Sequence, residues 1–177
     1  MTLTINQAKL RELEKELGCT FRDDGTFAEM ALFLHDYTEK TRPVPGVRFE
    51  MYHGDLQTLR EAVAQVEDDW PQYFSEDADV FCAFVGDRIA SFCILDWDVD
   101  CAVSAAGIRV GAVGCVGTIP EYRRRGIGLR MVDLATLALR DAGCDVSYIH
   151  YTHVDKWYSK LGYQTYARFS FVGREEE

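Results

Sequence analysis

The sequence predicts an α/β protein in which strands and helices alternate along the chain. A strand-forming run at residues 108–118 is followed, after Pro120, by an apolar pattern of helical spacing at residues 127–138. Upstream, two strand patterns at residues 80–85 and 88–95 are separated only by a Gly-Asp turn, which is typical of a β-hairpin. These observations predict a sheet whose third consecutive strand leads directly into a helix.

The remaining elements of this alternation follow in chain order. Residues 47–53 have the alternating character of a short strand, and Asp55 caps a helix that ends before Pro71. Gly143 ends the helix that follows the long strand. The last three predicted elements are a strand at residues 145–151, a helix at 155–161 and a strand at 163–172.

The first 46 residues predict two helices ahead of this alternation. Thr4 begins a capping box for a helix that Gly18 ends. Thr26 and Glu29 repeat the capping signal and predict a second helix at residues 27–38. We therefore divide the chain into an N-terminal two-helix extension at residues 1–46, a main domain at residues 47–173 and an acidic tail at residues 174–177.

The composition is that of a soluble globular protein. The 177 residues can bury the core of one domain, and 47% apolar with 27% charged residues is ordinary. No apolar run approaches the roughly 20 residues that span a bilayer, and the N-terminus lacks the pattern of a secretory signal. A net charge of -10 disfavours nucleic acid as a partner. The sequence therefore predicts a cytoplasmic protein that binds neither membranes nor nucleic acid.

Neither the cysteines nor a row of aspartates predicts a reactive site. The six cysteines contain no Cys-x-x-Cys pair, so we expect reduced thiols. Cys115 has no His or Asp placed by the sequence to activate it as a nucleophile. The three aspartates within residues 96–100 resemble the start of a calcium loop. Such a loop later requires Gly and Glu, where this chain has Cys101 and Gly107, so we expect no metal.

The stretch between the long strand and its helix predicts an anion-binding loop. It carries Arg123, Arg124 and Arg125 where a helix begins, and a helix start offers free N–H groups and the positive end of the helix dipole. Gly126 and Gly128 lack a Cβ, which lets an anion approach the main chain and permits a positive φ. Two common phosphate motifs are absent because their Lys or their glycine spacing is missing. A solvated surface loop is the alternative interpretation.

Two short motifs resemble those of the GNAT superfamily of N-acetyltransferases. Arg-x-x-Gly-x-Gly at residues 123–128 is similar to the family's acetyl-CoA loop, and Tyr-x-x-x-Gly-Tyr at residues 158–163 is similar to its late signature. The order of predicted elements over residues 47–172 also matches. The resemblance implies the GNAT fold, a mixed six- to seven-stranded central sheet flanked by helices, to which the two-helix extension would be added.

The resemblance also implies a function. The chain would transfer an acetyl group from acetyl-CoA to a primary amine of a small molecule or peptide, by direct transfer in a ternary complex without a metal. Tyr158 falls where the family has the general acid toward the departing thiolate, residues 116–118 would pair with the pantetheine arm, and residues 124–129 would wrap the pyrophosphate. The implied cofactor-binding residues are Val116, Gly117, Thr118, Arg123, Arg124, Arg125, Gly126, Ile127, Gly128 and Leu129.

Departures from the family pattern leave the base open. Tyr151 stands where the family often has Asn, and Trp157 and Tyr163 replace the usual Leu and Phe. The strand at residues 108–118 contains no Asp or Glu, so the carboxylate base of some members is missing. The candidates for a base are His150, His153, Asp96, Asp98 and a water relay. The alternative function is therefore a non-catalytic acyl-CoA-binding sensor or scaffold module of the same fold.

The acceptor is not specified by the sequence. Residues 67–79 contain six acids and no Lys or Arg, in a region where the family builds part of the acceptor wall. Such a field of carboxylates could concentrate a cationic amine, whereas a solvated surface is the alternative interpretation. A polyamine, an aminoglycoside-like compound, an amino-acid derivative and a protein N-terminus or Lys all fit. The sequence also leaves open the acyl-chain preference and whether the chain forms a homodimer.

Overall fold

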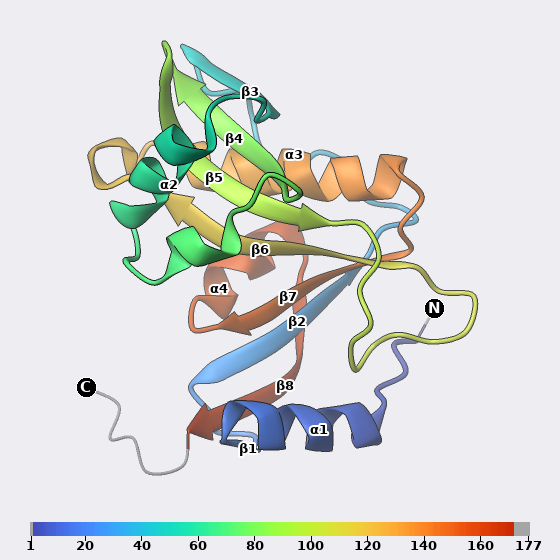
Figure 1. Cartoon of the computed structure of the whole chain (residues 1–177). Helices are drawn as coiled ribbons and strands as arrows, with labels where there is room; N and C mark the ends of the chain where they lie inside the picture. The colour runs from blue at the N-terminus through green and yellow to red at the C-terminus, as the bar shows by residue number, and fades with distance from the viewer. Residues whose placement is uncertain (1, 172–177) are drawn as a thin grey trace.

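The computed structural model describes residues 2–171 as one eight-stranded sheet with helices on both faces (Figure 1). The strand order is β1-β8-β2-β7-β6-β5-β4-β3, and only β6 and β7 are parallel neighbours. The strands are β1 (Cys19–Phe21), β2 (Phe27–Phe33), β3 (Val47–Met51), β4 (Asp79–Val85), β5 (Arg88–Asp96), β6 (Val110–Thr118), β7 (Val146–Thr152) and β8 (Gln164–Phe171). The helices are α1 (Gln7–Leu17), α2 (Leu56–Ala64), α3 (Ile127–Asp141) and α4 (Asp155–Tyr158), with 3-10 turns η1 (Trp70–Tyr73), η2 (Pro120–Tyr122) and η3 (Ser159–Leu161).

The predicted α/β class and the mixed sheet flanked by helices are confirmed. The six strands from β3 to β8 were expected, and β1 and β2 from the N-terminal segment raise the number to eight among residues 2–171. The acidic tail predicted at residues 174–177 lies outside the described residues. Within the described part of the chain, no helix has both the length and the apolar character required to cross a bilayer.

Two helices cover opposite faces of the sheet (Figure 1). Met131 and Leu139 of α3 are buried in one apolar cluster with Met30 of β2. Leu59 of α2 is buried in a second cluster with Phe92 of β5. The apolar stripe of each helix therefore faces the sheet. Burial of these stripes stabilises the packing of α3 on one face of the sheet and of α2 on the other.

The N-terminal segment begins with the predicted helix, α1. Its cap is Asn6 rather than Thr4, because the Asn6 side-chain oxygen accepts hydrogen bonds from the N–H groups of Ala8 at 3.0 Å and Lys9 at 3.3 Å. Gly18 ends the helix with a φ of 65°, as its position predicts.

The second predicted helix is wrong, because residues 27–33 form strand β2. This strand is inserted between β7 and β8 and pairs antiparallel with both. Four consecutive residues, 28–31, are buried, because both faces of the strand are covered. A strand that is covered on both faces does not alternate between apolar and polar residues, so its pattern cannot be told from that of a buried helix.

The parallel strands β6 and β7 diverge along their length. They pair only at Val110 with Val146, Gly111 with Ser147 and Ala112 with Tyr148. Beyond this point β6 stays with β5 as far as Thr118, and a register shift leaves one extra residue on β6, where Cys115 has a φ of 46°. A V-shaped opening therefore separates the last residues of β6 from β7, and α4 lies beside it in Figure 1.

Candidate active site

The chain leaves β6 through η2 and enters α3 at a left-handed glycine. Gly126 has a φ of 77° and is the N-cap of α3, and no side chain caps this helix. The N–H groups of residues 127–129 therefore have no partner within the helix. Arg124, just before them, also has a positive φ, of 61°. These N–H groups and the positive end of the helix dipole form a site that favours an anion.

Gly128 and Gly126 are required for different structural reasons. A Cβ at residue 128 would lie 2.5 Å from Thr118 Oγ1, whereas a Cβ at Gly126 would meet nothing within 4 Å. Thr118 Oγ1 is itself hydrogen-bonded to Ser91 Oγ at 3.0 Å. Gly126 thus provides the positive φ, and Gly128 allows the first turn of α3 to approach β6 closely.

The close contact at Gly128 predicts a specific stability defect. Gly128→Ala is expected to lower the free energy of unfolding by about 1–3 kcal/mol, because the new methyl group overlaps Thr118 Oγ1. Urea titration measures this loss. Gly114→Ala is the matched control on β6, since a Cβ there meets nothing within 4 Å. Adding Thr118→Ala to Gly128→Ala should recover part of the loss, and a double variant less stable than both single variants would contradict the proposed clash.

The three loop arginines lie in different environments. Arg123 Nε donates a hydrogen bond to the Thr118 carbonyl oxygen at 2.9 Å, which fastens the loop to the end of β6. The Arg125 guanidinium lies 5.7 Å from the ring centroid of Tyr122, within cation–π range. The Arg124 side chain is exposed. All three charges stay close to the start of α3, and Arg123 and Arg124 border the adjoining pocket.

One pocket of about 450 Å³ brings most of the predicted site residues together. Its lining comes from the end of β6, the turn η2, the start of α3, and α4 with the residue before it. The lining residues are Val116, Thr118, Tyr122, Arg123, Arg124, Gly126, Ile127, Gly128, Leu129, Val154, Trp157 and Tyr158. Two predicted residues are absent from this lining. Gly117 is buried, and a Cβ there would lie 2.4 Å from the Phe92 ring, while Arg125 packs on Tyr122.

Tyr158 closes the pocket at the end of α4. Only 6% of its surface is exposed, and its ring packs edge-on against Trp157 at 4.9 Å and Tyr163 at 6.0 Å between centroids. Its hydroxyl has no hydrogen-bond partner among residues 2–171, and it is not among the fully enclosed polar atoms, so it faces the pocket. Burial raises the pKa of Tyr158 above its usual range. The hydroxyl therefore keeps its proton at neutral pH and can donate it.

The candidate bases are distributed around the diverging strands. His150 lies on β7, with Nδ1 2.8 Å from Oε1 of the buried Glu29 on β2. The His153 ring lies edge-on to Phe27, with 6.3 Å between centroids. Burial and the nearby Asp79 raise the pKa of Asp96 at the end of β5, and Asp98 is exposed in the following loop. Sequence reasoning missed Glu29 as a site residue because it expected a helix there.

Cys115 lies in surroundings that keep its thiol protonated. Burial raises the pKa of the Cys115 thiol to about 11, so the thiol is protonated at neutral pH. All six cysteines are free. Among residues 2–171, no three His, Cys, Asp or Glu side chains group as ligands of a metal ion.

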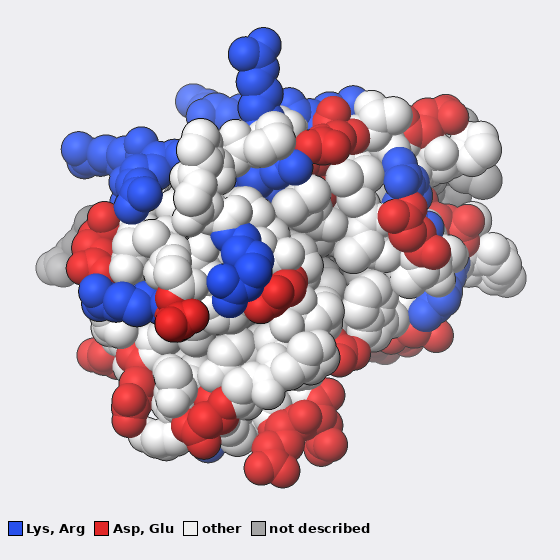
Figure 2. Space-filling model, turned by 90° about the horizontal axis from the view of Figure 1, so that it is seen from above, with Lys and Arg blue, Asp and Glu red and all other residues white. Residues whose placement is uncertain are grey.

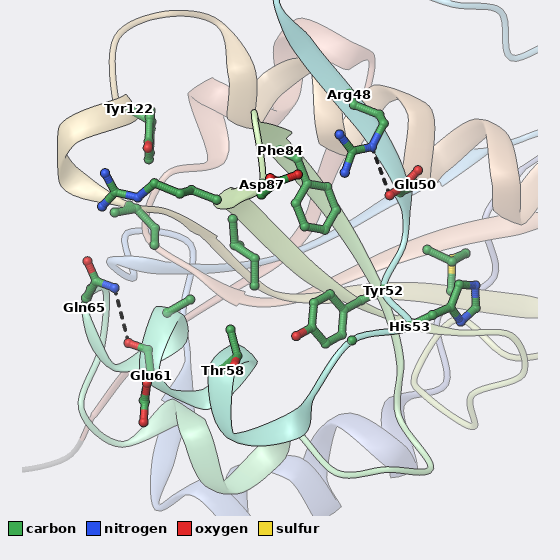
Figure 3. A pocket seen from close by; sticks show the side chains of 16 residues that line it. Arg48, Glu50, Tyr52, His53, Thr58, Glu61, Gln65, Phe84, Asp87 and Tyr122 are labelled. Atoms are coloured by element: carbon green, nitrogen blue, oxygen red, sulfur yellow. Dashed lines mark hydrogen bonds and ion pairs between the residues drawn. The ribbon is translucent and has the colours of Figure 1, made fainter.

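A second cavity, of about 540 Å³, lies between α2 and the strands β3 and β4 (Figure 3). The rings of Tyr52 and Phe84 stack in it at 6.4 Å between centroids. Its arginines are matched by acids, since Arg48 pairs with Glu50 at 3.0 Å and Arg88 with Glu121 at 3.1 Å. This cavity shares Tyr122 with the first pocket but contains neither the start of α3 nor Tyr158, so we place the candidate chemistry in the smaller pocket.

Solved structures of several acetyltransferases resemble this fold. One is described as a GCN5-related glucosamine N-acetyltransferase region in a fungal multi-domain GH3 β-N-acetylglucosaminidase; it has a TM-score of 0.69 and 18% identity, and the match covers 94% of this chain and 23% of that chain. A GCN5-related N-acetyltransferase from Kribbella flavida has a TM-score of 0.57 and 20% identity over 89% of this chain and 60% of that one. Another, from Sphaerobacter thermophilus, has a TM-score of 0.60 and 17% identity over 90% and 54%.

These likenesses establish the fold, and the chain spans less than two thirds of the length of each of the three structures. The comparison with curated proteins finds no match. The profile described as "Acetyltransferase (GNAT) domain" matches residues 76–165, which is just over half of the chain and includes β6, the arginine loop, α3 and Tyr158. On this match, together with the fold, the chain belongs to the GNAT acetyltransferase family.

Proposed function

We propose that the protein transfers an acetyl group from acetyl-CoA to the primary amine of a small molecule or peptide. The observation that carries this proposal is the 450 Å³ pocket, in which the uncapped start of α3, the diverging end of β6 and the Tyr158 hydroxyl meet. Transfer is direct, within a ternary complex of protein, acyl donor and amine. The free state of Cys115 and its raised pKa support direct transfer over an acylated cysteine.

The residues around the start of α3 fit a diphosphate. Uncapped N–H groups at residues 127–129, the helix dipole, and Arg123 and Arg124 supply donors and positive charge on one side of the pocket, and Arg125 lies beside them on the Tyr122 ring. The main chain at residues 116–118 borders the V-shaped opening and can pair with the pantetheine arm. The acyl donor supplies the activated thioester. A phosphate held at α3 and an arm held along β6 would bring that thioester toward Tyr158.

The chemistry then requires two proton movements. An ammonium acceptor loses a proton to a base, so that the neutral amine can attack the thioester carbon. As the C–S bond breaks, the Tyr158 hydroxyl gives its proton to the departing sulfur, and it regains a proton from the amide nitrogen through solvent. The products are an N-acetylated amine and a thiol, with one proton released to solvent.

The acceptor is proposed to enter from the α2 face, opposite the acyl donor. The acidic residues 67–79 flank η1 on this side and can attract a cationic amine. Seen from above, acidic side chains gather along the lower border and basic side chains at the upper left (Figure 2). Such a separation of charge would steer an anionic donor and a cationic acceptor to different sides. The cytoplasm is the proposed compartment, which six unpaired thiols support.

The proposal is tested by titrating coenzyme A into the pure protein in a calorimeter and then following thiol release from acetyl-CoA. The acceptor panel contains spermidine, kanamycin, glucosamine and a lysine-bearing peptide. Saturable heat and amine-dependent thiol release are expected. Absence of heat would refute the cofactor site. Binding without thiol release by any amine would instead favour the acyl-CoA-binding sensor, for which the lack of an acid on β6 is the specific argument.

A further inference from the structure

Glu29 is a fully buried carboxylate that belongs to the inserted strand β2 and binds three groups of β7. It has 0% of its side-chain surface exposed. Its Oε1 accepts hydrogen bonds from His150 Nδ1 at 2.8 Å and the Tyr151 N–H at 3.0 Å, and its Oε2 accepts one from the Tyr148 hydroxyl. A buried carboxylate is costly unless such donors satisfy it, and here they all come from one strand.

The position of His150 places this cluster beside the opening of the sheet. The last pair between β6 and β7 is Ala112 with Tyr148, so His150 lies two residues beyond it, on the diverging part of β7. Side chains alternate along a strand, and Ile149 packs in the cluster that contains α3. His150 and Tyr148 therefore project to the other face, the face from which we propose that the acceptor enters.

The hydrogen bond to Glu29 determines which nitrogen of His150 is free. A carboxylate only accepts hydrogen bonds, so Nδ1 carries the proton and donates it. Nε2 then has a lone pair, and no residue among 2–171 forms a hydrogen bond with it. The side chain is 41% exposed, so an amine or a water molecule can reach this nitrogen.

The other titratable groups of the cluster remain neutral. They are Tyr148 on β7, Tyr166 on β8 and Cys101 in the loop between β5 and β6. Burial, followed for the two tyrosines by the nearby Glu29, raises the pKa of each of these three groups. Glu29 is thus the group in this cluster that can balance a positive charge on His150.

We propose that His150 is the general base of the acetyl transfer and that Glu29 is its positioning residue. This inference rests on the proposed function. His150 Nε2 takes one proton from the ammonium group of the acceptor, directly or through one water, and the imidazolium forms against the Glu29 carboxylate. The neutral amine attacks the thioester carbon, the C–S bond breaks, and Tyr158 protonates the sulfur. Tyr158 regains a proton from the new amide nitrogen through solvent, and His150 releases its proton to solvent, which together restore the starting state.

The test compares His150→Gln, Glu29→Gln and the control His35→Gln, whose side chain is 88% exposed after β2. We expect His150→Gln to lower kcat by about 10²-fold with the coenzyme A dissociation constant unchanged. Glu29→Gln should lower kcat by about 10-fold to 100-fold with the coenzyme A dissociation constant unchanged, because the carboxylate that orients the imidazole ring is gone. His35→Gln should match the wild type.

A second measurement needs no acyl donor. The ¹⁵N NMR signals of the neutral His150 imidazole in the free protein should show a protonated Nδ1 and an unprotonated Nε2, and Glu29→Gln should alter that preference. A dominant Nε2–H form, or an unchanged kcat in both variants, would overturn the role of His150 while leaving the proposed function intact. A wild-type protein that binds no coenzyme A, or binds it without amine-dependent turnover, would overturn both.

Discussion

Tyr158→Phe is expected to lower kcat of the acetyl transfer by about 10²-fold, while the dissociation constant of coenzyme A stays within about twofold. The substitution removes only the hydroxyl, which has no hydrogen-bond partner among residues 2–171 and faces the pocket. The ring keeps its edge contacts with Trp157 and Tyr163, so folding should be unaffected. Thiol release under saturating acetyl-CoA and calorimetric titration measure the two quantities.

Tyr163→Phe is the matched control for this result. The Tyr163 hydroxyl is buried and hydrogen-bonded to Thr136 Oγ1 at 2.8 Å and Ser147 Oγ at 2.7 Å. Its removal should cost about 1–3 kcal/mol of stability because two buried hydroxyl groups lose a partner, with little effect on kcat. If Tyr158→Phe also leaves kcat unchanged, the general acid is another group and Tyr158 is only a packing residue.

The predicted elements that the structure confirms are those whose sequence pattern lies entirely within one short stretch of the chain. The hairpin of β4 and β5, and the passage from β6 through Pro120 into α3, each lie within a short contiguous stretch whose turn residues and periodicity agree. The catalytic role that the family resemblance gives to Tyr158 stays a prediction, although this residue, about thirty residues beyond the arginine loop along the chain, borders the same pocket.

The largest failure, the second predicted helix, is a case in which distant contacts override a local pattern. The segment Phe27–Phe33 has a capping signal and an apolar pattern that suit a helix, and only its place between β7 and β8 makes it a strand. Glu29 was consequently interpreted as a helix-capping residue. Its actual partners, Tyr148 and His150, follow it by 119 and 121 residues, and no local pattern encodes such contacts.

Asp133→Ala is expected to lower the free energy of unfolding by about 3–5 kcal/mol, the largest stability loss we predict. Asp133 is fully buried on α3. One carboxylate oxygen accepts from the Tyr37 hydroxyl at 2.8 Å, and the other accepts from the N–H groups of Lys40 at 2.9 Å and Thr41 at 2.6 Å and from the Thr41 hydroxyl at 2.6 Å. Removing it leaves the buried Tyr37 hydroxyl and the part-buried donors of Lys40 and Thr41 without their acceptor.

The partners of Asp133 explain why its substitution should also disturb the proposed active site. They belong to the segment that carries the chain from β2 to β3, so Asp133 fastens the end of the inserted strand to the helix whose first turn borders the pocket. Asp141→Ala is the control on the same helix. Asp141 is 65% exposed and pairs at the surface with Arg140, so its loss should cost at most about 1 kcal/mol. Urea titrations that gave equal losses for the two variants would show that the segment is held by apolar packing instead, and that β2 and α3 are coupled only through the core.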